Sequence, residues 1–158
     1  MLRPRDAIDF INKCFSAANG KTVIQIHELT TAEEYYFDSR KKALKDEWKA
    51  VYPEVDTYVD ILLRFVKKQT FNTDVLHKLK NDIKESLIAT NNMDDMIVQK
   101  AVEDKDVIQD LLEIWFKIGV VGIRKDKNII LYSNFSKRHL NVVDYSKDFY
   151  IHPLFWRR

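Results

Sequence analysis

The sequence has 158 residues, 46% of them hydrophobic and 32% charged, which excludes a disordered tail and a membrane protein. Its 26 lysines and arginines nearly balance 24 aspartates and glutamates, so the net charge of +2 predicts no polyanionic partner from bulk charge alone. Only three glycines and three prolines are present, a scarcity that disfavours glycine-rich nucleotide-binding enzymes and loop-rich all-β folds and favours helices.

The first expected helix starts near Pro4, which suits a first helical turn, and stops at Gly20. Its apolar residues recur at helical spacing and are Ile8, Ile11, Cys14, Phe15 and Ala18. The tripeptide Gly20-Lys21-Thr22 is like the end of a phosphate-binding loop, but such a loop needs another glycine where Phe15 stands. We therefore interpret Gly20 as a helix stop.

The second expected helix begins at Thr31, because Thr31 and Glu34 form a capping-box pattern, and it ends before Pro53. Residues 21–29, which precede it, alternate imperfectly between apolar and polar and predict a short strand or an extended connector. The apolar stripe of this helix consists of Tyr36, Phe37, Ala43, Leu44 and Trp48. Its other face is densely charged.

The middle of the chain predicts further helices. One covers about residues 54–68, and a second starts after the N-cap sequence NTD at 72–74. A third covers about residues 104–118 and closes at Gly119. The segment 90–104 is the least regular part of the chain and is expected to hold one short helix.

The hydrophobic period changes after Gly119. VVGIR (120–124) and NIILYS (128–133) are β-branched and aromatic runs joined by polar residues, which predicts a β-hairpin. The tail from Phe135 to Arg158 is aromatic and irregular until YIHPLFWRR (150–158). We expect the tail to be buried, because its end is too apolar to be left in water, with Phe149, Tyr150, Ile151, Leu154, Phe155 and Trp156. The sequence thus predicts a mainly α fold with a small β-hairpin.

The order of these elements is that of a winged helix, in which a recognition helix is followed by a hairpin that forms the wing. We expect two domains, a helical segment over residues 1–53 and a winged-helix domain with an aromatic C-terminal tail over residues 54–158. In this interpretation residues 104–118 are the recognition helix and residues 120–133 are the wing.

Charges are unevenly distributed within the expected winged helix. The recognition helix and its approach carry Glu103, Asp104, Asp106, Asp110 and Glu113 against Lys105 alone. Such a surface repels phosphate. The wing region collects cations instead, namely Lys117, Arg124, Lys125, Lys127, Lys137 and Arg138. Two interpretations stay open, a wing that rests on a nucleic-acid backbone and a solvated face without a ligand.

The sequence contains no motif for catalysis or metal binding. His27, His77, His139 and His152 lack metal-ligand spacing, and Cys14 is interpreted as a small core residue. We expect no catalytic residue, no metal and no cofactor. The start MLRPRDAIDF lacks the apolar run of a signal peptide, and no stretch approaches about 18 apolar residues, so we expect a cytoplasmic protein without a membrane segment.

Arg3 and Arg5 flank Pro4 at the start of the first expected helix. Cations at this end of a helix oppose its dipole, and residues that break a local preference are sometimes functional. A salt bridge with Asp6 or Asp9 is the alternative explanation for the two arginines.

The segment RPRDAIDFINKCFSAA resembles the start of the helical lid in P-loop ATPases of the AAA+/STAND type. The segments TTAEEYYFDSRKKALKDEWKAVYPEV, LLEIWFKIGVVGIR and IHPLF extend this resemblance over nearly the whole chain. Together they are similar to the C-terminal part of a bacterial P-loop ATPase family linked to DNA-repair and anti-phage loci. The resemblance implies that residues 1–53 form a helical lid and that Arg3 or Arg5 senses the γ-phosphate of a nucleotide.

The ATPase core of that family is absent from this sequence. It has no Walker A lysine, Walker B acid or central sheet, so we expect no enzymatic activity and no binding of Mg-ATP unless an ATPase core lies upstream. The chain is then either a fragment of a larger ATPase or a free-standing subunit, and a start at the lid boundary favours the fragment.

Two functions follow as expectations. In the first, the chain is a non-catalytic C-terminal regulatory and interaction module of a P-loop ATPase, which couples nucleotide state to a protein partner or to the parent ATPase domain. In the alternative, it is a DNA-binding winged-helix domain that contacts the phosphate backbone through its basic wing. The sequence leaves the partner and the oligomeric state open.

Overall fold

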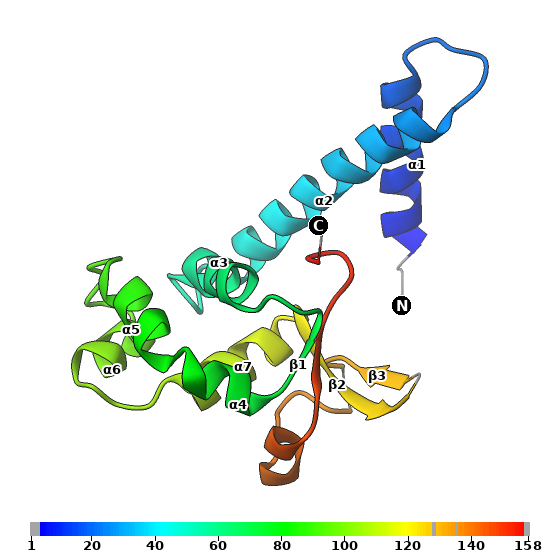
Figure 1. Cartoon of the computed structure of the whole chain (residues 1–158). Coiled ribbons are helices and arrows are strands. Elements are labelled where there is room, and N and C mark those ends of the chain that lie inside the picture. Colours follow the sequence, from blue (N-terminus) through cyan, green and yellow to red (C-terminus); the bar gives the residue numbers. More distant parts are fainter. Residues whose placement is uncertain (1–3, 128, 135, 157–158) are drawn as a thin grey trace. The chain divides into compact units, whose positions relative to one another are not determined.

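The computed structural model describes residues 4–127, 129–134 and 136–156, with side chains from residue 7 onward (Figure 1). The chain divides into two compact units, Met1–Asp46 and Glu47–Arg158, which we call unit 1 and unit 2. Helices dominate the described residues and a small antiparallel sheet accompanies them, which confirms the predicted fold class. The predicted domain boundary after residue 53 lies a few residues beyond this division and stays a prediction.

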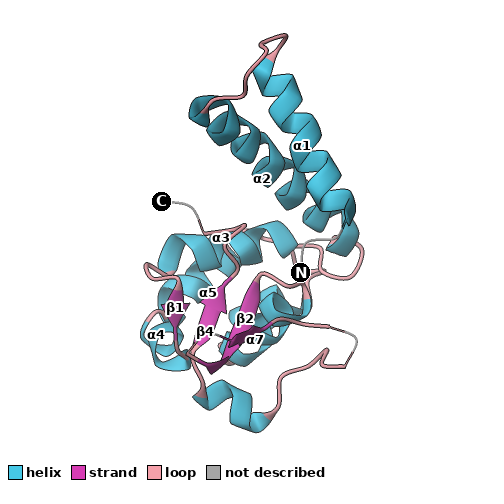
Figure 2. Ribbon diagram, turned by 90° about the vertical axis from the view of Figure 1, so that its right-hand side faces the viewer, coloured by secondary structure: helices cyan, strands magenta, loops and turns pink. Residues whose placement is uncertain are grey.

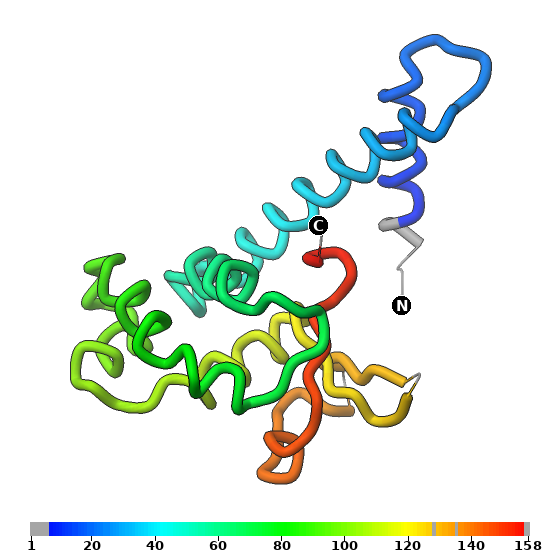
Figure 3. Tube along the Cα trace, viewed as in Figure 1, coloured from blue at the N-terminus to red at the C-terminus, as the bar shows by residue number. Residues whose placement is uncertain are grey.

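Unit 1 is a helical hairpin built from α1 (Pro4–Ala18) and α2 (Ile26–Trp48), whose last turn crosses into unit 2 (Figures 1 and 3). The predicted helix stop is confirmed, since Gly20 adopts a φ of 80°, a left-handed conformation that glycine takes without strain. The backbone N–H of Lys21 donates to the Ala18 carbonyl at 3.0 Å and closes the helix end.

The predicted start of the second helix is wrong. The helix α2 begins at Ile26, and the hydroxyl of Thr31 donates to the His27 carbonyl inside the helix instead of capping its start. The reason is an earlier cap, because the Glu28 carboxylate accepts the backbone N–H of Gln25 at 2.9 Å. Of residues 21–29, residues 21–25 form a loop, which agrees with the connector alternative, while residues 26–29 are already helical, which neither alternative predicted.

Unit 2 contains the remaining described helices, α3 (Val55–Phe65), α4 (Thr73–Lys78), α5 (Lys80–Ile88), α6 (Met96–Val102) and α7 (Ile108–Lys117). The predicted N-cap before α4 is confirmed, as the Asn72 side chain accepts the N–H of Val75. The helix expected from residue 104 starts later, because Asp104 has a φ of 58° and the Asp106 side chain accepts the N–H of Ile108.

The described strands of unit 2 form a sheet in the order β1-β4-β2-β3, with β1 (Thr70–Phe71), β2 (Val121–Asp126), β3 (Ile129–Leu131) and β4 (Phe149–Ile151). The predicted hairpin is confirmed as the antiparallel pair β2–β3. The burial expected of the tail is met at its described end, where Phe149, Ile151 and Phe155 are buried and Tyr150, Leu154 and Trp156 are half-buried, whereas Val142 and Val143 are exposed. The strand β4 was not predicted. Its residues alternate between buried Phe149 and Ile151 and half-buried Tyr150, the pattern of a strand packed on one face.

Helix α7 lies at the centre of unit 2, where it packs against α3, α4 and β2 (Figure 2). Trp115 is fully buried, and its indole N–H donates to the Tyr58 carbonyl on α3 at 2.8 Å. The Tyr58 hydroxyl in turn donates to Asp95, which caps α6 by accepting the N–H groups of Ile97 and Val98. One buried polar chain therefore ties α7, α3 and α6 together.

Candidate functional site

A line of large apolar side chains is exposed on α1 of unit 1. Ile8, Ile11 and Phe15 are 60%, 49% and 63% exposed, and their spacing of three and four residues places them on one helix face. We call these three residues the α1 stripe. The sequence pattern had indicated a single apolar face that also included Cys14 and Ala18, and the structure separates the two sets.

The hairpin interior combines small residues with one aromatic pair. Cys14 and Ala18 of α1 and Ala32 of α2 are all buried, while Phe10 meets the buried Tyr36 ring edge-on at 5.7 Å. Small side chains let two helices approach closely, and a pair of helices has only one shared face to bury. The bulkier α1 stripe is therefore left outside. The interpretation of Cys14 as a small core residue is confirmed.

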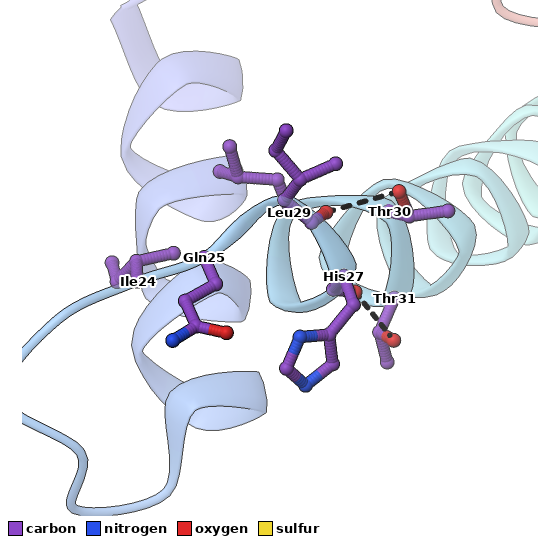
Figure 4. Close-up of a pocket in the computed structure, with 7 residues that line it drawn as sticks. Ile24, Gln25, His27, Leu29, Thr30 and Thr31 are labelled. Carbon is purple, nitrogen blue, oxygen red and sulfur yellow. Dashed lines mark hydrogen bonds between the residues drawn. The ribbon is translucent and has the colours of Figure 1, made fainter.

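Further apolar residues are exposed where the chain turns from α1 into α2. Val23 and Ile26 are 65% and 82% exposed, and Leu29 lines a shallow open pocket (Figure 4). The two threonine hydroxyls in that pocket are already engaged, because Thr30 and Thr31 donate to backbone carbonyls of the preceding helical turn. The pocket lining is thus mainly apolar surface.

The turn is held in shape by the buried carboxylate of Glu28, which is 1% exposed. Lys21 Nζ lies 2.5 Å and His27 Nε2 lies 2.8 Å from Glu28 Oε1, and the Gln25 N–H donates to Oε2. The Lys21 hydrogen bond holds the pKa of Glu28 below its ordinary value, although burial acts in the opposite direction. Both oxygens of this carboxylate are used in fixing the loop, which indicates a structural role.

The predicted nucleotide-sensing arginines are not placed by the structure. Arg3 lies outside the described residues, and Arg5 belongs to α1 but its side chain is also outside them. Their role as sensors therefore stays a prediction. The α1 stripe begins on the same helix, one turn further along.

The cations of the predicted basic wing differ in their exposure and their contacts. Lys117 Nζ lies 5.6 Å from the centre of the Tyr52 ring, Arg124 donates to the Thr70 hydroxyl, and Lys137 pairs at 2.5 Å with the buried Asp144. Lys125 and Lys127 are exposed at the tip of the β2–β3 hairpin, and Arg138 is exposed in the following loop. Among these six cations, the exposed pair at the hairpin tip therefore forms the most accessible basic surface.

The predicted acidic recognition helix corresponds to α7, which lies mainly in the core of unit 2 and has little exposed surface. Most of α7 is buried, and its acidic residues are engaged in unit 2. Asp110 pairs with Lys100 at 2.8 Å, while Glu113 contacts His139 and accepts the N–H of Leu140 at 2.8 Å. The connection between β3 and β4 therefore covers part of the polar face of α7.

The described residues contain neither a membrane-spanning helix nor a metal-binding cluster. No helix in the described ranges is long and apolar enough to cross a membrane. Within the same residues, histidine, cysteine and acidic side chains form no group that could hold a metal ion.

Comparison with known proteins gives one match. Residues 1–45 match a family model described as a FunZ-associated C-terminal helical domain. The matched residues coincide almost entirely with unit 1, so the family model and the structure define nearly the same segment. This match fits a helical accessory domain. No curated protein and no solved structure matches the chain.

Proposed function

We propose that this chain is a non-catalytic regulatory and interaction module of a P-loop ATPase, which binds a protein partner through unit 1. The α1 stripe carries the proposal. Burying a large aliphatic or aromatic side chain contributes about 1.5–3 kcal/mol, so three of them in one line form a strong anchor for a partner. Exposed apolar surface gathered in this way marks an interaction surface, whereas scattered apolar residues do not.

The partner that we propose first is FunZ, because the matched family is described as associated with it. The resemblance of the first residues to an AAA+/STAND lid adds that the partner is an ATPase whose nucleotide state alters docking. A nucleotide effect on docking is a coupling between two sites, and it requires different contacts in the two nucleotide states. We therefore expect the affinity for FunZ to differ between ATP and ADP.

Titration calorimetry with the full chain tests this proposal. The partner is a purified FunZ protein. The variants are Ile11→Asp, Phe15→Asp and the control Asn12→Asp, all at exposed α1 positions. We expect each stripe variant to weaken binding at least about tenfold and the control to bind like the unchanged chain. Equal binding by all variants, or no binding by the unchanged chain, overturns the proposal.

The arginine sensor is tested separately in the same assay. We expect Arg3→Ala or Arg5→Ala to remove the difference between ATP and ADP while preserving binding in the absence of nucleotide. A difference that survives in both variants and in the double variant rules out a sensor at this helix start.

A winged-helix assignment of unit 2 belongs to the proposal. It is supported by the order of helix, short strand, helices, hairpin and returning strand, with β4 lying between β1 and β2 in the sheet. A second candidate function, contact with a DNA backbone, is favoured by exposed Lys125 and Lys127 at the hairpin tip.

Gel-shift titration of duplex DNA at low and at physiological salt distinguishes the two functions. DNA binding through the tip predicts a shift at low salt that weakens with added salt and with Lys125→Ala/Lys127→Ala. The absence of a shift at low salt excludes this second function.

A further inference from the structure

Helices α3 and α5 of unit 2 lie side by side and line an open groove of about 460 Å³ (Figures 1 and 2). The lining residues recur at three- and four-residue spacing on both helices, so the groove runs along their surfaces. Its apolar part is formed by buried Ile61 and half-buried Phe65 of α3 and by exposed Ala89 at the end of α5. The groove belongs to unit 2 alone.

Acidic residues occupy the α5 wall of this groove. Asp82 and Glu85 are both exposed there, one helical turn apart. The lysines of α5 do not neutralise them, because Lys84 pairs with Asp104 at 2.6 Å and Lys80 lies 3.9 Å from Asp106. The Lys84 side chain is only 7% exposed, so its ammonium group is held next to Asp104 and away from the groove acids. The cations and the anions of α5 are thus segregated onto different faces.

The α3 wall contributes one cation, and that cation is used locally. The guanidinium of Arg64 lies over the Phe65 ring, 5.4 Å from its centre. A guanidinium stacked on an aromatic ring shields its apolar face and keeps its own charge near that ring. The groove therefore has an apolar strip with one arginine and the exposed acid Asp60 on the α3 side and two acids on the α5 side, so acids outnumber cations along its walls.

We propose that this groove binds a basic amphipathic helix of a partner protein. Helix-in-groove recognition requires an apolar strip for residues spaced i, i+3, i+4 and i+7, and the lining of this groove supplies one between two helices. The charge on the α5 wall selects lysine and arginine beside that apolar face and rejects acidic helices. This surface is separate from the α1 stripe and goes beyond the function proposed above.

A pair of designed peptides tests the groove on the full chain. Each peptide has about 15 residues with leucines at i, i+3, i+4 and i+7, and the two differ only in carrying lysines or glutamates at the flanking positions. We expect the lysine peptide to bind at least about tenfold more tightly than the glutamate peptide by fluorescence anisotropy, with an affinity that falls as salt rises. In amide NMR spectra, the shifted signals should lie in α3 and α5.

Matched charge variants locate the site. Asp82→Asn/Glu85→Gln should weaken the lysine peptide about tenfold. The control Glu103→Gln/Asp126→Asn removes the same charge from exposed positions outside the groove and should bind like the unchanged chain. Ala89→Arg places a cation at the end of α5, where the helix dipole favours it, and should also weaken binding by crowding and repelling the peptide.

Three results overturn the proposal. These are equal affinity for both peptides, equal losses in the groove and control variants, and NMR shifts confined to unit 1. Analytical ultracentrifugation supplies a further check, because self-association that is lost in Asp82→Asn/Glu85→Gln would assign the groove to a second copy of this chain. Since the FunZ titration depends on the α1 stripe and these titrations depend on the groove, failure of one leaves the other unaffected.

Discussion

The two units of the chain bury different kinds of side chain. In unit 2 the fully buried residues include Trp115, Tyr58, Phe116 and Phe149, gathered around α7 and the sheet. In unit 1 the buried set is mostly small, with Cys14, Ala18 and Ala32 between the helices, and large apolar residues are exposed. Unit 2 buries large apolar side chains in a core of its own. Unit 1 instead exposes large apolar side chains of the kind that are usually buried.

This difference has a simple geometric cause. Helices around a sheet can bury apolar residues on several faces, but a helical hairpin has a single shared face. Apolar residues that exceed the capacity of that face must contact another surface or remain in water. This comparison is the physical basis of the two proposals, association through exposed apolar residues in unit 1 and recognition through groove shape and charge in unit 2.

The largest effect is expected in the core of unit 2. Trp115→Ala removes a fully buried ring and its hydrogen bond to the Tyr58 carbonyl, and should lower the free energy of unfolding by about 3–5 kcal/mol. Chemical denaturation followed by circular dichroism measures this loss. Trp48→Ala, at a half-buried position, is the control and should cost less. A loss below about 1 kcal/mol for Trp115→Ala would contradict a central position of α7.

A smaller loss is expected at Gly122, where strand β2 passes close to a side chain of β3 and to the tyrosine that follows β3. An added Cβ would lie 2.5 Å from the Ile130 side chain and 2.9 Å from the Tyr132 ring. Gly122→Ala should therefore destabilise the protein by about 1–3 kcal/mol, as overpacking does. The double variant Gly122→Ala/Ile130→Ala opens space and should recover part of that loss. Strictly additive losses in thermal melts would show that the close approach is not the cause.

Local signals account for the parts of the fold that the sequence predicted correctly. The stop at Gly20, the cap at Asn72 and the β2–β3 hairpin each depend on residues within a few positions of one another. Strands β1 and β4 were missed because their pairing joins Phe71 to Phe149, a partner that no local pattern reveals. The Thr31 cap failed because Glu28 caps the helix one turn earlier.

The candidate sites depended on information that spacing alone does not carry. The five residues of the predicted apolar face of α1 repeat at helical spacing, but the hairpin buries only the small ones, with Cys14 and Ala18 inside and the stripe outside. Lys137 counted toward a basic wing by its place in the sequence, but the fold pairs it with Asp144. The acidic wall of the α3–α5 groove was missed because Lys80 and Lys84 alternate with the acids in the sequence.

The free energy of unfolding of unit 2 should depend moderately on pH through His152. Burial lowers the pKa of His152, whose Nδ1 accepts the Leu154 N–H at 3.1 Å and whose ring contacts Tyr132. The unfolded chain then takes up this proton at higher pH than the folded chain, so stability is complete above about pH 6.5 and declines as the pH falls below it. The asparagine variant His152→Asn keeps an acceptor and should decline less between about pH 7.5 and 5. Parallel stability curves for the two proteins would refute this assignment.

The smallest effect on stability is expected at the α1 stripe, and there the absence of an effect is the informative result. Phe15→Ala removes a side chain that is 63% exposed, so the free energy of unfolding should change by less than about 0.5 kcal/mol. Ala18→Leu is the matched change inside the hairpin, where 3% exposure leaves no room, and should cost about 1–3 kcal/mol as measured by amide hydrogen exchange in α1 and α2. If Phe15→Ala is as costly as Ala18→Leu, the stripe supports folding and is not available to a partner. If only Ala18→Leu is costly, the hairpin keeps its fold without the stripe, and a loss of partner binding in stripe variants then reports on the interface itself.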